Sequence, residues 1–173
     1  MKKIFFLEIL TMTFLILISI TFTAEAEKGE EKAVQEMEIK GLAFDQTVQS
    51  PVVFLTDKEQ NSVLPIWIGL CEARSIELEL AGQVSPRPLT YDLIAAIIRT
   101  MEAKVERIVI VDLRDQVFYA QVELSVNGKV SKIDARPSDA IALASRMNSP
   151  IFVKKTVLDK AALLETDKKK QGL

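Results

Sequence analysis

An Asn-Gly pair at residues 127–128 separates two segments in which apolar and polar side chains alternate. Alternation with a period of two is typical of a β-strand that buries one face, and Asn-Gly favours a two-residue hairpin turn. The pattern therefore predicts an antiparallel hairpin in which Val126 pairs with Lys129. In that register Glu123 lies opposite Lys132, so the hairpin has one apolar face and an opposite-charge pair on the other.

The rest of the chain predicts an α+β fold around this hairpin. Runs rich in β-branched and aromatic residues indicate strands, and apolar residues three and four positions apart indicate helices. We expect further strands at residues 37–44, 51–56, 62–69, 104–112 and 150–155, and helices at residues 70–82, 89–101 and 157–164, with another helix starting at Pro137. The order β-β-β-α-α-β-β-β-α-β-α predicts a single compact domain with a mixed or antiparallel sheet and helices packed on it.

The composition bounds the classes of function. The chain has 173 residues and a net charge of −2, whereas proteins that hold nucleic acid mainly through phosphates are normally basic. A nucleic-acid partner would therefore require a local basic patch. The sequence contains no histidine, which removes the commonest general base and the commonest zinc ligand. Cys71 is the single cysteine, so no intrachain disulfide forms, and we expect it to be a small buried residue.

Residues 1–26 have the pattern of a cleaved signal peptide, with lysines near the start, an apolar run at 9–22 and small residues before the expected cleavage point. The run is shorter than the roughly 20 apolar residues of a membrane helix. We therefore expect an exported protein, periplasmic or secreted, with no stable membrane span after cleavage; an uncleaved N-terminal membrane anchor is the alternative. A flexible leader at 27–36, a domain at 37–164 and a disordered tail at 165–173 complete the expected organisation.

The segment DARPSDAIALA, residues 134–144, places three charged side chains at the start of an otherwise apolar helix. Pro137 suits the first helical position, and Asp139 falls in the first turn, where the helix dipole stabilises a carboxylate. The hairpin register places Asp134 on the polar face of the sheet. Either these carboxylates form an ion network with Arg136 that fixes the corner, or the corner is a functional site.

Four segments together resemble the bifunctional nuclease domain family, namely PVVFLTDKEQNSVLPIWIG, RPLTYDLI, AKVERIVIVDLRDQVFYA and IDARPSDAIALA. They occur in the family's order and at its spacing, and the resemblance covers residues 37–159. It implies a compact α+β fold, often a homodimer, with nuclease activity on both DNA and RNA. Members of the family commonly have histidine where this chain has Tyr91, so chemistry that depends on that histidine would here be impaired or use the tyrosine.

If the chain hydrolyses phosphodiester bonds as the resemblance implies, an economical arrangement without histidine is Mg²⁺ or Mn²⁺ held by carboxylates beside an arginine clamp. The predicted catalytic residues are Asp139, Asp134 and Asp92, and Asp134 and Asp139 are also the predicted metal ligands. Arg136 and Arg87, each followed by proline at a helix entry, are the predicted phosphate-binding residues. The further candidates are Tyr91, Asp112 and Asp115.

Two functions stay open from the sequence. The first is an exported, divalent-metal-dependent nuclease that acts on DNA and RNA. The second is a non-catalytic anion-binding or oligomeric assembly module of the cell envelope, in which the same corner binds a ligand or braces a homodimer. Asp112 and Asp115 also suit a turn, and we expect Trp67 in the core or at a dimer contact rather than as a platform for stacked bases.

Overall fold

The computed structural model describes residues 33–170. The chain divides into two units, Met1–Val34 and Gln35–Leu173, and the fold given below is that of the second unit. The expected signal peptide at 1–26, with its alternative as a membrane anchor, lies outside the described residues. Within the described part of the chain, no helix is both long enough and apolar enough to cross a membrane.

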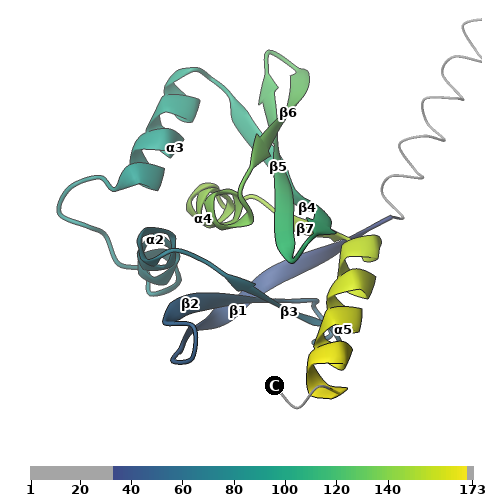
Figure 1. Ribbon diagram of the computed structural model, residues 1–173. Coiled ribbons are helices and arrows are strands. Elements are labelled where there is room, and N and C mark those ends of the chain that lie inside the picture. The colour runs from purple at the N-terminus through teal and green to yellow at the C-terminus, as the bar shows by residue number, and fades with distance from the viewer. Residues whose placement is uncertain (1–32, 171–173) are drawn as a thin grey trace, which may run out of the picture. The chain divides into compact units, whose positions relative to one another are not determined.

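Seven strands in the described residues form a sheet in the order β3-β2-β1-β7-β4-β5-β6 (Figure 1). The strands are β1 (Val34–Asp45), β2 (Ser50–Thr56), β3 (Val63–Trp67), β4 (Lys104–Arg114), β5 (Val117–Val126), β6 (Lys129–Ala135) and β7 (Ile151–Lys154). β1 with β2, β2 with β3, β4 with β5 and β5 with β6 are antiparallel, whereas β7 pairs with β4 in parallel. The mixed sheet and the order of the elements confirm the predicted α+β fold.

Four helices accompany the sheet in the part of the chain that the structure describes, and α4 is the central one. They are α2 (Leu70–Leu80), α3 (Thr90–Thr100), α4 (Pro137–Met147) and α5 (Lys155–Lys170). α4 contacts α2 and α3 as well as β3, β4 and β5, whereas α5 packs on β4 and β7 (Figure 1). This enclosure explains why α4 is built almost entirely of small and apolar residues: a helix apolar on most of its circumference is stable only when buried.

The hairpin between β5 and β6 has the predicted register, with Glu123 opposite Lys132. The Lys132 Nζ lies 3.5 Å from a Glu123 carboxylate oxygen, and Arg107 of β4 donates to the same carboxylate at 2.8 Å. These two cations explain how Glu123 can be buried. Asn127 and Gly128 have φ values of 51° and 78°, the left-handed conformation that a two-residue hairpin turn requires and that Asn and Gly adopt most readily.

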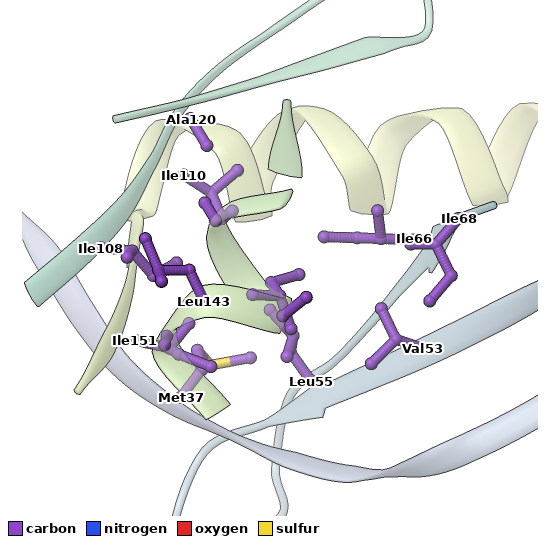
Figure 2. Packing of buried hydrophobic residues seen from close by; sticks show 14 of the residues in the cluster. Met37, Val53, Leu55, Ile66, Ile68, Ile108, Ile110, Ala120, Leu143 and Ile151 are labelled. Carbon is purple, nitrogen blue, oxygen red and sulfur yellow. The ribbon is translucent and has the colours of Figure 1, made fainter. Parts of the chain in front are cut away.

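The hydrophobic core is continuous between the strands and α4. Figure 2 shows Ile108 and Ile110 of β4 gathered with Leu143 of α4 and Ile151 of β7. Leu55 of β2 belongs to the same cluster, so strands from both halves of the sheet contribute to one core. Ile108, Ile110 and Leu55 have no exposed surface. The position of α4 is therefore set by apolar contacts with strands that are distant in the sequence.

The largest differences from the expected boundaries lie at the two ends of the domain. β1 begins at Val34, within the expected leader at 27–36, and α5 continues to Lys170 through most of the expected tail at 165–173. The lysine-rich composition of the tail explains the second difference, because lysine and glutamate are good helix formers even where the pattern lacks an apolar face.

Burial in the core was wrongly expected for two residues, whereas the alternative that Trp67 lies at a dimer contact stays a prediction. Cys71 is exposed, because the buried face of α2 is formed by its neighbours, which include Ala73 and Ile76. Trp67 is 45% exposed and is not part of the core. It lies at the end of β3, where its indole N–H donates to Asp45 at 3.0 Å, so the polar edge of the ring is satisfied without burial.

The central place of α4 predicts a large cost for a cavity inside it. Ile141 has no exposed surface, so we expect Ile141→Ala to lower the free energy of unfolding by about 2–5 kcal/mol. Ile97→Ala, at a half-exposed position of α3, is the matched control and should cost less than about 1 kcal/mol. Urea unfolding followed by circular dichroism measures both. Equal losses for the two variants would contradict the central role of α4.

Candidate functional site

Three helices bring four polar side chains together at the start of α4: Glu72 of α2, Tyr91 of α3, Arg136 and Asp139. We refer to these four residues as the Arg136 cluster. Pro137 occupies the first position of α4, as predicted. Arg136 and Asp139 are neighbours within one helical turn, whereas Glu72 and Tyr91 reach them only because the fold brings α2 and α3 against α4.

The guanidinium of Arg136 bridges two carboxylates. Its Nε and Nη2 donate to the two oxygens of Asp139 at 2.6 and 2.8 Å, and Nη2 also donates to Oε1 of Glu72 at 2.7 Å. These bonds use three of the five N–H donors of a guanidinium. The two donors on Nη1 make no hydrogen bond with a residue that the structure describes, and 69% of the side chain is exposed. Arg136 therefore retains a pair of donors for an external acceptor.

Tyr91 is buried, and its hydroxyl donates to Oδ1 of Asp139 at 2.6 Å. Burial and this hydrogen bond raise the pKa of Tyr91 well above its ordinary value of 10.0. The tyrosine therefore stays protonated at neutral pH. It acts as a neutral donor that holds Asp139 in place, and not as a base.

Asp139 is held in its ionised form. Partial burial opposes its ionisation, but the hydrogen bonds from Arg136 and Tyr91 outweigh that effect and keep the pKa of Asp139 below its ordinary value of 3.8. The hydrogen bond to Asp139 also raises the pKa of the Arg136 guanidinium. Because both oxygens of Asp139 already accept hydrogen bonds, this carboxylate is poorly suited to take a proton from a water molecule.

Glu72 is a candidate that the sequence pattern did not single out. Its side chain is only 10% exposed, and its one ion-pair partner among the described residues is Arg136. A Cβ added at Gly69, the N-cap residue of α2, would lie 2.3 Å from Oε2 of Glu72, so the absence of a side chain there makes room for the carboxylate. The sequence did contain a sign of this role, since Glu72 lies beside Ala73 and Ile76 on the apolar face of α2. A carboxylate buried on such a face requires a partner.

Asp92 lies at the entry of α3, where it belongs to a different ion network. Its Oδ2 accepts a hydrogen bond from the backbone N–H of Leu89 at 2.8 Å and thereby caps the helix. Its Oδ1 lies 2.9 Å from Nε of Arg146, whose Nη1 lies 2.5 Å from Glu79 of α2. This network joins the last turn of α4 to α2 and α3. Asp92 thus helps to position the helices that carry the Arg136 cluster.

Asp134 and Arg87 lie away from these contacts. Asp134 is exposed on β6, opposite Gln121, as the hairpin register predicts. Arg87 is exposed in the connector before α3. In the described residues Arg136 pairs with Asp139 and Glu72 and not with Asp134. The structure therefore places one of the two predicted phosphate-binding arginines in the cluster and leaves the other on the surface.

Asp112 and Asp115 belong to the corner between β4 and β5. Asp112 pairs with Lys160 of α5 at 2.8 Å and with Arg114 at 2.9 Å, and the hydrogen bond from Lys160 is the main cause of its lowered pKa. Asp115 and Gln116 form the two-residue turn, with φ values of 49° and 63°. Asp112 therefore ties α5 to the sheet, and Asp115 serves the turn.

The described residues contain no group of three or more Cys, Asp or Glu side chains that could hold a metal ion. Asp139 has both oxygens engaged in hydrogen bonds, and Asp134 is exposed on β6. The two predicted metal ligands therefore do not form a shared set of free carboxylate oxygens for Mg²⁺ or Mn²⁺. The roles assigned to Asp134, Asp139 and Asp92 in catalysis or metal binding stay predictions.

A cleft with a volume of about 800 Å³ opens beside the Arg136 cluster. Its walls come from β3, the turn between β4 and β5, the first turn of α4, and α5. Trp67, Val117 and Leu164 line it and are partly exposed. Arg136 lines the same cleft, so its exposed guanidinium adjoins a largely apolar surface.

Two comparisons with known proteins give matches. The sequence model of the bifunctional nuclease domain matches residues 53–166. Two uncharacterized proteins of Mycobacterium tuberculosis, from strains CDC 1551 / Oshkosh and ATCC 25618 / H37Rv, are each 42% identical to this chain over 132 residues. The aligned region covers 76% of this chain and 79% of each relative. All four residues of the Arg136 cluster lie within the matched domain.

The environment of Tyr91 predicts an unusual alkaline titration. The chain has two tyrosines, so Tyr119→Phe leaves Tyr91 as the single phenol. Because the pKa of Tyr91 is raised in the folded state, its contribution to stability is present below pH 10 and is lost only as the pH rises through the higher folded pKa. We expect tyrosinate absorbance in this variant to appear well above pH 10, and adding Asp139→Asn should lower that midpoint. Ionisation of the folded variant near pH 10 would contradict the structure.

Proposed function

Because the chain belongs to the bifunctional nuclease domain family, we propose that it is a nuclease that hydrolyses phosphodiester bonds of DNA and RNA. The single observation that carries the proposal is the exposed guanidinium of Arg136, which keeps two N–H donors available. The two available N–H groups are both on Nη1 and point in different directions, so one of them can donate to a phosphate oxygen and the other to a second acceptor. We further propose that the protein works outside the cytoplasm, in the periplasm or as a secreted protein, on the basis of the N-terminal sequence pattern.

In this proposal each residue of the Arg136 cluster has its own role. Arg136 binds the phosphate and stabilises the charge that develops on it during attack by water. Glu72 is the general base, since its Oε1 accepts from Arg136 while Oε2 accepts no hydrogen bond from a described residue. Tyr91 and Asp139 are positioning residues, because they act on the substrate through Arg136.

The charge of the cluster bears on how it would hold nucleic acid. One arginine faces two carboxylates, so the site attracts a phosphate through directed hydrogen bonds and not through net positive charge. The proposed route takes its phosphate ligand and its base from Arg136 and Glu72, since the described residues contain no group of three or more Cys, Asp or Glu side chains that could hold a metal ion. Metal dependence is therefore tested as a separate arm of the experiment.

The pairing of both carboxylates with Arg136 also favours a second function. Both carboxylates of the cluster are bonded to Arg136, and the Asp92 network braces the opposite end of α4. Such a network also suits a rigid scaffold. The second candidate is therefore a non-catalytic anion-binding or oligomeric assembly module of the cell envelope, in which the cluster serves stability and recognition without turnover.

Cleavage of labelled single-stranded DNA and RNA tests the nuclease proposal. We expect Arg136→Gln to reduce the rate about 10- to 100-fold, because it removes a charge-assisted hydrogen bond to phosphate. Arg99→Gln, at an exposed position of α3, is the matched control and should retain the wild-type rate. Each protein is assayed with Mg²⁺, with Mn²⁺ and with EDTA, after circular dichroism shows that it is folded.

The outcomes of this assay separate the two candidate functions. Cleavage that survives EDTA and is lost in folded Arg136→Gln supports the proposed route. Cleavage that EDTA abolishes supports a metal-dependent nuclease. Its metal ion would then need ligands in addition to those of the described residues. If folded wild-type protein cleaves neither substrate under any condition, the nuclease proposal is overturned and the scaffold function leads.

A methyl group at Gly69 offers a test directed at Glu72. Gly69 has a φ of −76°, which alanine adopts freely, but the added Cβ would meet Oε2 of Glu72 at 2.3 Å. We expect Gly69→Ala to displace the carboxylate and lower the cleavage rate about tenfold, because the hydrogen bond to Arg136 is lost. The free energy of unfolding should also fall, by about 1–3 kcal/mol, because a buried carboxylate loses its partner. Leu70→Ala, at the adjacent exposed position, is the control, and equal rates in both variants would argue against Glu72 as the base.

A further inference from the structure

The cleft beside the Arg136 cluster differs from the rest of the surface in its chemistry. Among the described residues that line it, Arg136 is the only charged one, and most of the others are apolar. Its volume of about 800 Å³ lies within the range of small-molecule sites, roughly 300–1,000 Å³. Arg136 is already paired with Glu72 and Asp139, so the cleft would hold an anionic group through directed hydrogen bonds from Nη1 and an apolar body through its walls.

We propose that this cleft binds a small amphipathic anion, with its apolar body against Trp67 and Val117 and its anionic group on Arg136. The anionic group would use the same Arg136 donors as the phosphate of the proposed nuclease site, and the apolar walls of the cleft would contact the body of the ligand. The proposal does not depend on nuclease activity, and its test contains no nucleic acid.

The donors that would hold the anionic group are already in place. Nη1 of Arg136 keeps both of its N–H groups available. Ser138, the second residue of α4, also lines the cleft, and its hydroxyl makes no hydrogen bond with a residue in the described part of the chain. A carboxylate or a phosphate monoester presents two or more acceptor oxygens, which match these donors.

The apolar walls of the cleft would contact the apolar body of the ligand. Trp67 and Val117 are 45% and 54% exposed, although both are large hydrophobic residues. They come from different strands and share the cleft with Phe118 and Leu164. Covering such side chains with an alkyl body removes apolar surface from water, which favours binding.

Tryptophan fluorescence reads out binding directly, because Trp67 is the single tryptophan of the chain and lines the cleft. The full-length protein is titrated with octanoate, octyl phosphate and octanol. We expect both anions to shift the emission of Trp67 and to bind at least about tenfold more tightly than octanol, since a charged oxygen accepts a stronger hydrogen bond from Arg136 than a neutral hydroxyl does. The two anions distinguish a carboxylate ligand from a phosphate ligand.

Two variants show where the probe binds. Val117→Glu places a carboxylate inside the cleft and should weaken octanoate binding at least about tenfold. Val130→Glu on β6 introduces the same charge at a similarly exposed position outside the cleft and should bind as wild type does. Arg136→Gln should abolish the preference for octanoate over octanol. If Arg136→Gln does not fold, the Val117→Glu comparison stands by itself.

Three results would overturn the proposal. One is equal affinity for octanoate and octanol, which would mean that Arg136 takes no part. Another is equal binding by Val117→Glu and Val130→Glu, which would place the probe elsewhere. The third is a dimer, seen by sedimentation, in which acrylamide does not quench Trp67 and octanoate has no effect; a second copy of the chain would then be the occupant of the cleft.

Discussion

The enclosure of α4 is the constraint on which the rest of the structure depends. Its apolar residues complete the core between the strands, and α2 and α3 pack against it. The charged side chains in the first and last turns of an enclosed helix must still find partners, because an unpaired charge at a buried helix end is costly. The Arg136 cluster does this at the entry of α4, and Arg146 does it at the last turn with Asp92 and Glu79.

The two ion networks explain why the structural and functional interpretations of the corner overlap. Both networks connect α4 to α2 and α3. The charged groups of the Arg136 cluster that could bind a phosphate therefore also hold the three helices together. Removing one partner from a buried pair leaves an uncompensated charge and costs more than the pair contributes. Arg136 differs from the other charged residues of the cluster because most of its side chain is exposed. Glu72 and Asp139 hold it in place, and the two N–H groups on Nη1 remain available to bind a ligand.

Much of the fold follows from local patterns. The Asn-Gly turn and the alternation on either side of it predict the register of β5 with β6, because both depend on residues that are adjacent along the chain. Pro137 and Asp139 likewise predict the entry of α4. Cys71 and Trp67 show the limit of such reasoning. Their exposure depends on which neighbouring elements cover them, and residue type alone predicts the opposite of what is found.

In the candidate site, too, some features follow from neighbouring residues and others from the packing of distant helices. The sequence by itself determined the order of the elements and offered Asp134 and Asp139 as neighbouring partners of Arg136, and the structure selects Asp139, one helical turn away. Only the tertiary structure decided that Glu72 and Tyr91 complete the cluster, that Asp92 serves another network, and that Asp134 and Arg87 remain outside. The physical reason is that these contacts join helices separated along the chain, whose meeting depends on how the apolar faces of α2 and α3 pack against α4.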